Sequence, residues 1–470
     1  MEALIMLRRE LAELRKNVLP LAIATIVLAG TSVALSSSPS GAATSASRAL
    51  TSSVATNGEW PGVGKICEPG SGGTSSVRGV GDKTIHIAVF NDAANTVEPG
   101  LEEELVQQAM AFAAWCNASG GINGRDIVID DRDAALFNAA QVTVQACQSD
   151  FMAVGGGMAL DQPSVPIREQ CGLGQISGYL ASDASEVASD QVDPGGGNTD
   201  TWPSGWFREL AKAYPQAVKK AGMGGANTPS VLEPERKYEF GAEAQGWKVV
   251  DFQQPPIAVT DWAPYVDEAQ SKGVEALWPS LDDNIVPYFQ AMTTAGFHPA
   301  FVILGVQFYN STTSSGVAAN PGLPPVYLET SWWPLEMASQ NPSTEQLINV
   351  MHRYAKGDAV DFDDEEGAES WLLWAKSASA CGADLTVSCV LSHAAATKNW
   401  DAGGIQAPIA NLSLSDLDPQ PSPCFALLKV EPNKFVYDKA LTQPTQSIWN
   451  CNPRNVVHLT PQELKQLSSL

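Results

Sequence analysis

The residues best suited to chemistry in this sequence stand in loops directly after predicted β-strands. In the first half of the chain these candidates are Asn91, Asp92, Gly157, Met158, Ala159, Ser177 and Tyr179. In the second half they are Asn227, Ser280, Asp282, Gln307, Tyr309 and Trp332. Amide, carboxylate and hydroxyl side chains can meet a ligand amine or hydroxyl, and glycine lets backbone N–H groups approach a carboxylate. These residue types favour reversible binding of a small molecule.

Each candidate also has a purely structural interpretation. Asn91 and Asp92 serve equally well as helix caps. For Asp282 and its neighbour Asp283, capping at a helix start is preferred over pairing with a ligand cation. Trp332 suits the wall of a ligand site, although packing in a core or hinge is at least as common for such an aromatic residue.

Catalytic and metal-binding motifs are missing from the sequence. It contains no G-x-S-x-G, H-E-x-x-H or G-x-x-x-x-G-K-[ST] pattern, and its five histidines are scattered. The acidic run at 361–366 has the wrong spacing for an EF-hand loop. We expect a solvated acidic loop there, and neither an enzyme, nor a metal site, nor a cofactor.

The eight cysteines favour disulfides over metal or redox chemistry, because their number is even and no C-x-x-C is present. Cys381 and Cys389 flank a helix end and form the pair that we expect first. The remaining pairs would be Cys424 with Cys451, Cys147 with Cys171 and, by elimination, Cys67 with Cys116. The connectivity beyond the first pair stays open.

Hydrophobic patterning predicts strands that alternate with helices. The predicted strands cover 84–90, 126–130, 151–154, 175–178, 222–226, 247–252, 274–278, 300–304, 326–330, 425–430 and 434–437. The predicted helices cover 99–116, 138–150, 207–221, 261–272, 283–295, 343–354 and 367–380. Such alternation is typical of parallel, doubly wound sheets with right-handed crossovers.

The order of these elements predicts an α/β fold with two doubly wound, Rossmann-like lobes joined by a hinge that the chain crosses several times. Lobe 1 would comprise 82–203 and 331–410, and lobe 2 would comprise 204–330 and 411–455. A tail would follow at 456–470. Two domains also fit the length of 470 residues.

The N-terminus resembles an export signal. Arg8, Arg9, Arg15 and Lys16 precede an apolar run at 18–35, and small residues follow it. We expect a signal peptide or anchor at 1–45 and a flexible Ser/Gly-rich linker at 46–81. The alternative is an uncleaved anchor at 18–35, which would be the only membrane contact. No cysteine stands just after the apolar run, so a lipoprotein is not expected.

Five stretches together carry a resemblance to a known family. They are GLEEELVQQAMAFAAWCNASGGINGRDIVIDDRD, AAQVTVQACQSDFMAVGGG, TDWAPYVDEAQSKGVEALWPS and ACGADLTVSCVLSHAAA with PSPCFALLKV. In their order and spacing they resemble the branched-chain amino-acid type of periplasmic binding protein, the substrate-binding subunit of ABC importers. The resemblance covers about residues 80–440 and implies a clamshell with a ligand cleft between its lobes.

The resemblance also implies partners: a small-molecule ligand and an ABC permease, with the binding protein acting as an exported monomer. Amino-acid binders of the family tend to carry Ser or Thr where this chain has Met158, Ala159 and Leu160. The ligand would therefore be an amino acid or a more apolar metabolite. A net charge of −24 disfavours nucleic acids. An extracellular sensor of the same fold remains the alternative to transport.

Overall fold

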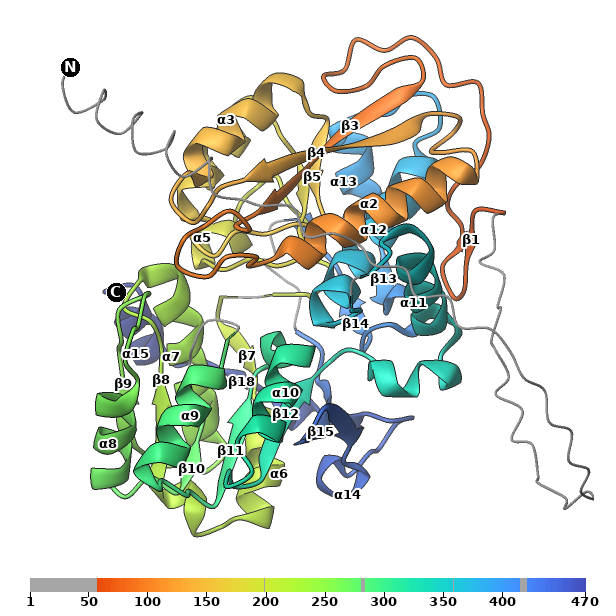
Figure 1. Cartoon of the computed structure of the whole chain (residues 1–470). Helices are drawn as coiled ribbons and strands as arrows, with labels where there is room; N and C mark the ends of the chain where they lie inside the picture. The colour runs from red at the N-terminus through yellow and green to blue at the C-terminus, as the bar shows by residue number, and fades with distance from the viewer. Residues whose placement is uncertain (1–56, 198, 280–283, 358, 415–420) are drawn as a thin grey trace, which may run out of the picture. The chain divides into compact units, whose positions relative to one another are not determined.

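The structure is a computed structural model that describes residues 57–197, 199–279, 284–357, 359–414 and 421–470. Its two α/β lobes each contain a mainly parallel sheet with helices on its faces (Figure 1). The predicted fold class is confirmed. The chain passes from lobe 1 to lobe 2 near 203, returns after 330, and re-enters lobe 2 before 424.

Lobe 1 is built on the strand order β4-β3-β5-β6, in which all neighbours are parallel. Its first part contains β1 (Glu59–Trp60), β2 (Gly64–Lys65), β3 (Thr84–Asn91), α2 (Glu103–Ala118), β4 (Asp126–Asp133), α3 (Ala139–Ser149), β5 (Met152–Val154), α4 (Val165–Cys171), β6 (Gln175–Ile176) and α5 (Asp183–Glu186). Its second part contains α11 (Pro342–Tyr354), α12 (Phe362–Ala380), α13 (Val387–Ala395), β13 (Lys398–Trp400) and β14 (Ile409–Asn411).

The layers of lobe 1 follow from the alternation of side chains along β3. Ile85, Ile87 and Val89 belong to the core that α2 and α12 cover, whereas Ala88 and Phe90 belong to the core beneath α3. Figure 1 shows α2 and α12 on one face of this sheet. A strand buried on both faces explains why the sequence at 84–90 is almost continuously apolar.

Lobe 2 carries the larger sheet, with the strand order β16-β15-β12-β11-β10-β8-β9. Its elements are β7 (Thr201–Pro203), α6 (Gly205–Ala213), β8 (Ala221–Gly224), α7 (Pro229–Ala244), β9 (Val249–Gln253), α8 (Ala263–Ser271), β10 (Ala276–Leu277), α9 (Val286–Ala295), β11 (Phe301–Leu304), α10 (Ser311–Ala319), β12 (Val326–Thr330), β15 (Cys424–Glu431), β16 (Lys434–Tyr437), α14 (Lys439–Thr442), β17 (Asn450–Cys451), β18 (Val456–His458) and α15 (Pro461–Leu467). The strands from β9 to β12 are parallel, and β15 and β16 extend the sheet antiparallel.

Two segments that the sequence predicts to be linker and tail are packed in the structure. Trp60 is 1% exposed and donates to the Ser343 hydroxyl at 2.7 Å, so the β1–β2 hairpin belongs to the core of lobe 1. At the other end, β18 pairs antiparallel with β7, and Leu467 of α15 packs on Phe240. Apolar residues inside these polar stretches explain the difference from a flexible chain.

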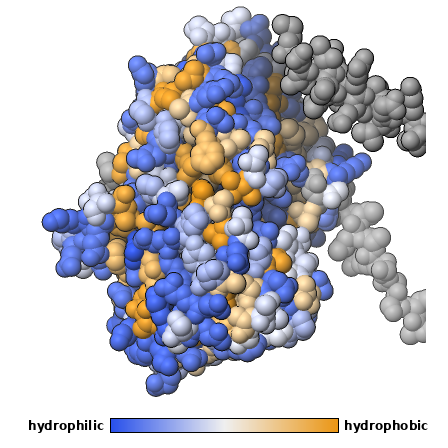
Figure 2. All heavy atoms as spheres, turned by 60° about the vertical axis from the view of Figure 1, so that its left-hand side comes forward, coloured by the Kyte–Doolittle hydropathy of each residue, from blue (hydrophilic) through white to orange (hydrophobic). Residues whose placement is uncertain are grey.

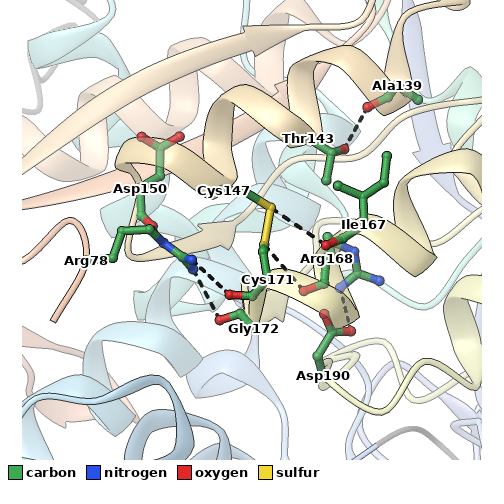
Figure 3. Close-up of a disulfide and its surroundings, with 10 residues drawn as sticks. All are labelled: Arg78, Ala139, Thr143, Cys147, Asp150, Ile167, Arg168, Cys171, Gly172 and Asp190. Atoms are coloured by element: carbon green, nitrogen blue, oxygen red, sulfur yellow. Dashed lines mark hydrogen bonds and ion pairs between the residues drawn. A yellow bond between two sulfur atoms is a disulfide. The ribbon is translucent and has the colours of Figure 1, made fainter.

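All four expected disulfides are formed, which confirms the predicted pairing. Lobe 1 holds Cys67–Cys116, Cys147–Cys171 and Cys381–Cys389, and lobe 2 holds Cys424–Cys451. Figure 3 shows the Cys147–Cys171 bond between α3 and α4.

Arg78 lies beside the Cys147–Cys171 disulfide and forms hydrogen bonds to the backbone around it (Figure 3). Its guanidinium donates to the backbone carbonyls of Asp150 at 2.7 Å, Cys171 at 2.9 Å and Gly172 at 3.2 Å. The covalent bond and the guanidinium together hold the end of α3 beside the end of α4.

The surface of the protein is mostly hydrophilic on the face that Figure 2 shows, with apolar side chains gathered near the middle of that face. Over the described residues, the large apolar side chains that are exposed are Met110, Phe137, Val144, Val187, Leu414, Val436 and Leu470. These residues come from both lobes and from separate elements.

Candidate functional site

A cavity of about 690 Å³ lies between segments of the two lobes. Lobe 1 lines it with Val97, Glu98, Pro99, Gly100, Leu101, Glu102, Glu103, Glu104, Gln107, Gly357, Ala359, Asp361, Phe362 and Asp363. Lobe 2 lines it with Val259, Trp262, Asn284, Pro287, Gln307, Tyr309, Asn310, Ser311 and Thr312. The volume falls within the range of about 300–1,000 Å³ that is usual for small-molecule sites.

The two sides of this cavity differ in charge. The lobe 1 side carries six carboxylic acids, which we call the acidic wall: Glu98, Glu102, Glu103, Glu104, Asp361 and Asp363. The nine described residues that lobe 2 contributes have no charged side chain, and we call them the neutral wall.

The start of α2 supplies three members of the acidic wall. Glu103 and Glu104 lie in the first turn of the helix, where the helix dipole favours negative charge. Glu102 precedes the helix with a φ of 65° and accepts a hydrogen bond from the Tyr179 hydroxyl. Burial and the charge of Glu102 raise the pKa of Tyr179 well above its usual value, so this hydroxyl keeps its proton and remains a donor.

The start of α12 supplies Asp361 and Asp363, and here the prediction of a solvated acidic loop at 361–366 is wrong. Asp361 caps α12 by accepting from the Asp363 N–H at 3.2 Å, and Asp364 accepts from the Asp361 N–H at 3.0 Å. This capping box begins the helix at Phe362. The acids that follow, including Glu365 and Glu369, are therefore on the helix and point into the buried interior. Burial and the charge of Glu104 raise the pKa of Asp363 to about 7.

Two further carboxyls of α12 are buried completely. Glu365 is 0% exposed, and neither of its carboxyl oxygens has a hydrogen-bond partner among the described residues. Glu369 is also 0% exposed and accepts from the Trp332 indole N–H at 3.0 Å. Burial raises the pKa of both groups well above the usual glutamate value, and neighbouring acids raise it further. Burial therefore favours the protonated form of both side chains.

Tyr309 joins the neutral wall to the acidic wall. Its backbone carbonyl accepts from the Phe362 N–H at 3.2 Å, and its hydroxyl donates to Glu336 and accepts from the Leu335 N–H at 2.8 Å. The ring is 2% exposed, and the charge of Glu365 contributes to its raised pKa. Tyr309 therefore fixes the distance between α12 and the segment after β11.

The candidate residues of lobe 1 lie beside this cavity, and none of these seven described residues is part of its lining. Asp92 accepts from the N–H groups of Leu136 at 2.6 Å and Ala159 at 2.8 Å, so it holds two loops together. Asn91 donates to Asp131 at 2.7 Å.

The other lobe 1 candidates pack around Tyr179. A Cβ on Gly157 would lie 2.2 Å from the Tyr179 ring, so only glycine fits this position. Met158 and Ser177 are buried. Through its bond to Glu102, Tyr179 connects this group to the acidic wall. A binding role for the lobe 1 candidates stays a prediction.

In lobe 2 the structure places Gln307 and Tyr309 in the cavity lining. Trp332 is close to it, because its ring contacts Phe362 with ring centroids 4.8 Å apart. Asn227 is exposed and outside the lining. Ser280 and Asp282 lie outside the described residues.

Sequence reasoning missed the segments 97–104 and 357–363, which form most of the lobe 1 side. The signal for the second segment was present, because Asp361 and Asp364 have the three-residue spacing of a capping box. The first segment has no comparable motif. It contains four acids, Glu98 and Glu102–Glu104, which were not among the predicted site residues.

Outside the cavity, Lys237 of α7 connects lobe 2 to α5 of lobe 1. It is 1% exposed, forms an ion pair with Asp183 and lies 3.7 Å from Glu186. The Asp183 N–H also donates to Glu233 of α7 at 3.3 Å. Burial raises the pKa of Glu186 to about 7, although the charge of Lys237 opposes this shift.

The model of the periplasmic binding protein family matches residues 84–434. A comparison with curated proteins finds no match. Among solved structures, the fatty acid ABC transporter substrate-binding protein from Thermomonospora curvata is similar with a TM-score of 0.67 and 16% identity, covering 82% of this chain and 97% of its own.

Two other similar structures contain bound ligands. A solute-binding protein from R. palustris in complex with benzoate has a TM-score of 0.63 and 14% identity, over 79% of this chain and 98% of its own. A branched-chain amino acid transporter substrate-binding protein from Streptococcus pneumoniae in complex with isoleucine has a TM-score of 0.59 and 13% identity. The match covers 76% of this chain and 99% of the Streptococcus protein. At such low sequence identity, these TM-scores show a shared fold and no more. Within the part of the chain that the structure describes, no helix combines the length and apolarity needed to cross a bilayer.

Proposed function

Because the chain belongs to the periplasmic binding protein family, we propose that it captures a small molecule between its lobes and delivers it to an ABC importer. The observation that carries this proposal is the 690 Å³ cavity whose walls come from both lobes. A ligand that contacts both walls stabilises the closed arrangement, and closure is the event that a transporter can recognise.

The proposal includes export. Family membership implies a protein that acts outside the cytoplasm. The signal peptide expected at 1–45 would direct this export, and the protein would work as a monomer that meets its permease through ligand-dependent closure. The solute-binding proteins similar to it in structure support a binding role rather than catalysis.

Filling the cavity tests the proposal directly. Thr312 is an exposed residue of α10 that lines the cavity, and Thr312→Trp would place an indole in the ligand space. The purified protein should show a melting temperature that rises with the concentration of a bound solute, as linkage requires. The variant should lose this rise because the ligand no longer fits.

Thr294→Trp is the matched control. Thr294 is an exposed threonine on α9 of the same lobe and is not part of the cavity lining. Its variant should bind like the unmodified protein. Equal binding by the Thr312→Trp variant and the control would refute the cavity as the site of capture.

A further inference from the structure

The charge of the cavity restricts the solutes that can enter it. The acidic wall contributes six carboxyl groups, and no lysine, arginine or histidine occurs among the described residues of the lining. Beside the low-dielectric interior of the protein, the field of these groups is screened less than at a fully exposed surface. An anionic solute would therefore be repelled, and a cationic one attracted.

Glu365 provides an independent indication that a positive charge belongs here. Its carboxyl is fully buried, has no hydrogen-bond partner among the described residues, and interacts electrostatically with Asp361 and Tyr309 of the lining. A buried polar group without a partner costs about 1–3 kcal/mol. A cation bound beside Asp361 and Asp363 would favour the ionised form of the carboxyls on this side of the cavity, which burial and mutual repulsion otherwise oppose.

The geometry favours an organic cation over a metal ion. Among the described residues, the one group of donor atoms close enough to hold a metal is Cys381, Cys389 and His393, and its two sulfurs form a disulfide. The carboxyls of the acidic wall are spread over α2, the loop before it and the start of α12. They suit an extended molecule rather than a single point charge.

The neutral wall can receive the body of such a molecule. Trp262 and Tyr309 are the aromatic residues of this wall, and Val259 and Pro287 are apolar. Aromatic rings attract cations as well as apolar groups, with about 0.5–2 kcal/mol for each well-placed cation–π contact. The Ser311 hydroxyl in the lining can meet a neutral polar atom of the ligand, whereas the Asn310 amide caps α10.

We propose that the captured solute is an organic amine without a carboxylate, whose protonated nitrogen faces Glu104 and Asp363 and whose body packs on Trp262 and Tyr309. This inference rests on the proposed function and specifies its ligand class. Benzoate and isoleucine, which are bound by the two structural neighbours, each carry a carboxylate that would meet the acidic wall.

Isothermal titration calorimetry with three classes of probe tests the ligand class. The amines are putrescine, spermidine and choline, the carboxylates are adipate, benzoate and isoleucine, and the neutral probe is 1,4-butanediol. At least one amine should bind, with an affinity that weakens as salt is added, and the carboxylates should not bind. Putrescine, adipate and butanediol share a four-carbon spacer, so their comparison isolates the charge.

The double variant Glu103→Gln/Glu104→Gln should weaken amine binding about tenfold to a hundredfold, because charge-assisted hydrogen bonds are replaced by neutral ones. The control is Glu243→Gln/Glu345→Gln, which removes the same charge from α7 and α11 at positions outside the lining. The control should bind amines as the unmodified protein does. Urea unfolding of all three proteins checks that each is folded.

The possible results separate the two proposals. Binding of carboxylates or butanediol without binding of amines would overturn the amine class and leave solute capture intact. Equal losses in the double variant and its control would overturn the assignment of the charged end to α2. Absence of binding by every probe would overturn solute capture and the amine class together.

Discussion

The acidic wall and the neutral wall enclose the same cavity but use opposite chemistry. The first consists of helix starts, where carboxylates gain from the helix dipole and from capping, and the second consists of loops after strands together with the starts of α9 and α10. Because the charges are confined to lobe 1, a ligand would be oriented by lobe 1 and enclosed by lobe 2. The acidic wall would thus determine which ligand binds, and the neutral wall would cover the bound ligand when the lobes close.

The largest effect should be on stability and should come from Lys237 of lobe 2, which forms ion pairs with acids of lobe 1 outside the cavity. Lys237→Met leaves Asp183 and Glu186 without their buried cation, and the free energy of unfolding should fall by about 3–5 kcal/mol. Urea unfolding at pH 7 measures this change. Lys248 is an exposed lysine of the same lobe, so Lys248→Met should change the free energy by less than about 0.5 kcal/mol. A loss below about 1 kcal/mol for Lys237→Met would show that the lobes do not depend on this contact.

Charge placed on each wall should have unequal effects on ligand affinity. Glu104→Lys puts an ammonium among the carboxyls of the acidic wall and should weaken amine binding about a hundredfold or more. Thr312→Lys adds one positive charge to the neutral wall and should weaken binding about tenfold or less, because it removes no carboxyl. Calorimetric titration with putrescine gives both values. Equal losses would contradict the division of roles between the walls.

The smallest expected effect is the dependence of ligand affinity on pH. The pKa of Asp363 is raised to about 7 by its burial and by the charge of Glu104 on the facing helix, and burial and the charge of Asp363 in turn raise the pKa of Asp361. A cation binds the ionised carboxylate, so affinity should be complete above pH 7 and should fall as pH drops below it. We expect a loss of about threefold to tenfold between pH 8 and pH 6.

The variant Asp363→Asn isolates this titration. It removes the group that changes its charge near pH 7, so the affinity of the variant should be lower and nearly constant between pH 6 and pH 8. Asp126→Asn, an exposed acid of β4 away from the cavity, is the control and should keep the full pH dependence. An unchanged pH profile in the Asp363→Asn variant would assign the titration to another carboxyl.

The sequence predicts the strands well because buried parallel strands leave unmistakable apolar runs. The predicted strands 84–90 and 300–304 agree with the parallel strands β3 and β11 to within one residue at each end. Cys381 with Cys389 was the one disulfide that the sequence singled out, because these two cysteines flank a helix end; the other three pairs depend on contacts between elements that are farther apart in the sequence. The linker expected to 81 and the tail expected from 456 differ from the structure because Trp60 and Leu467 find buried contacts that composition does not reveal.

The cavity was harder to predict than the fold. Gln307 and Tyr309 were found because they directly follow a strand, at the edge where ligands of parallel sheets usually bind. The acidic wall was missed because an isolated run of acids predicts solvent exposure, and only a capping box reveals that Glu365 and Glu369 turn inward with α12. The contacts between loops of different lobes depend on side-chain packing. The hydrophobic periodicity of the sequence predicts helices and strands but does not reveal these contacts.

The Cys67–Cys116 bond has a mechanical consequence. It joins the end of the β1–β2 hairpin covalently to α2, across a sequence separation of 49 residues. Tension that enters the protein from its N-terminal side passes through this bond into α2 and bypasses residues 68–115. Glu98, Glu102 and the first turn of α2 with Glu103 and Glu104 lie within the bypassed stretch. A protein held by its N-terminal segment could therefore bear a pulling force without deforming the acidic side of its cavity.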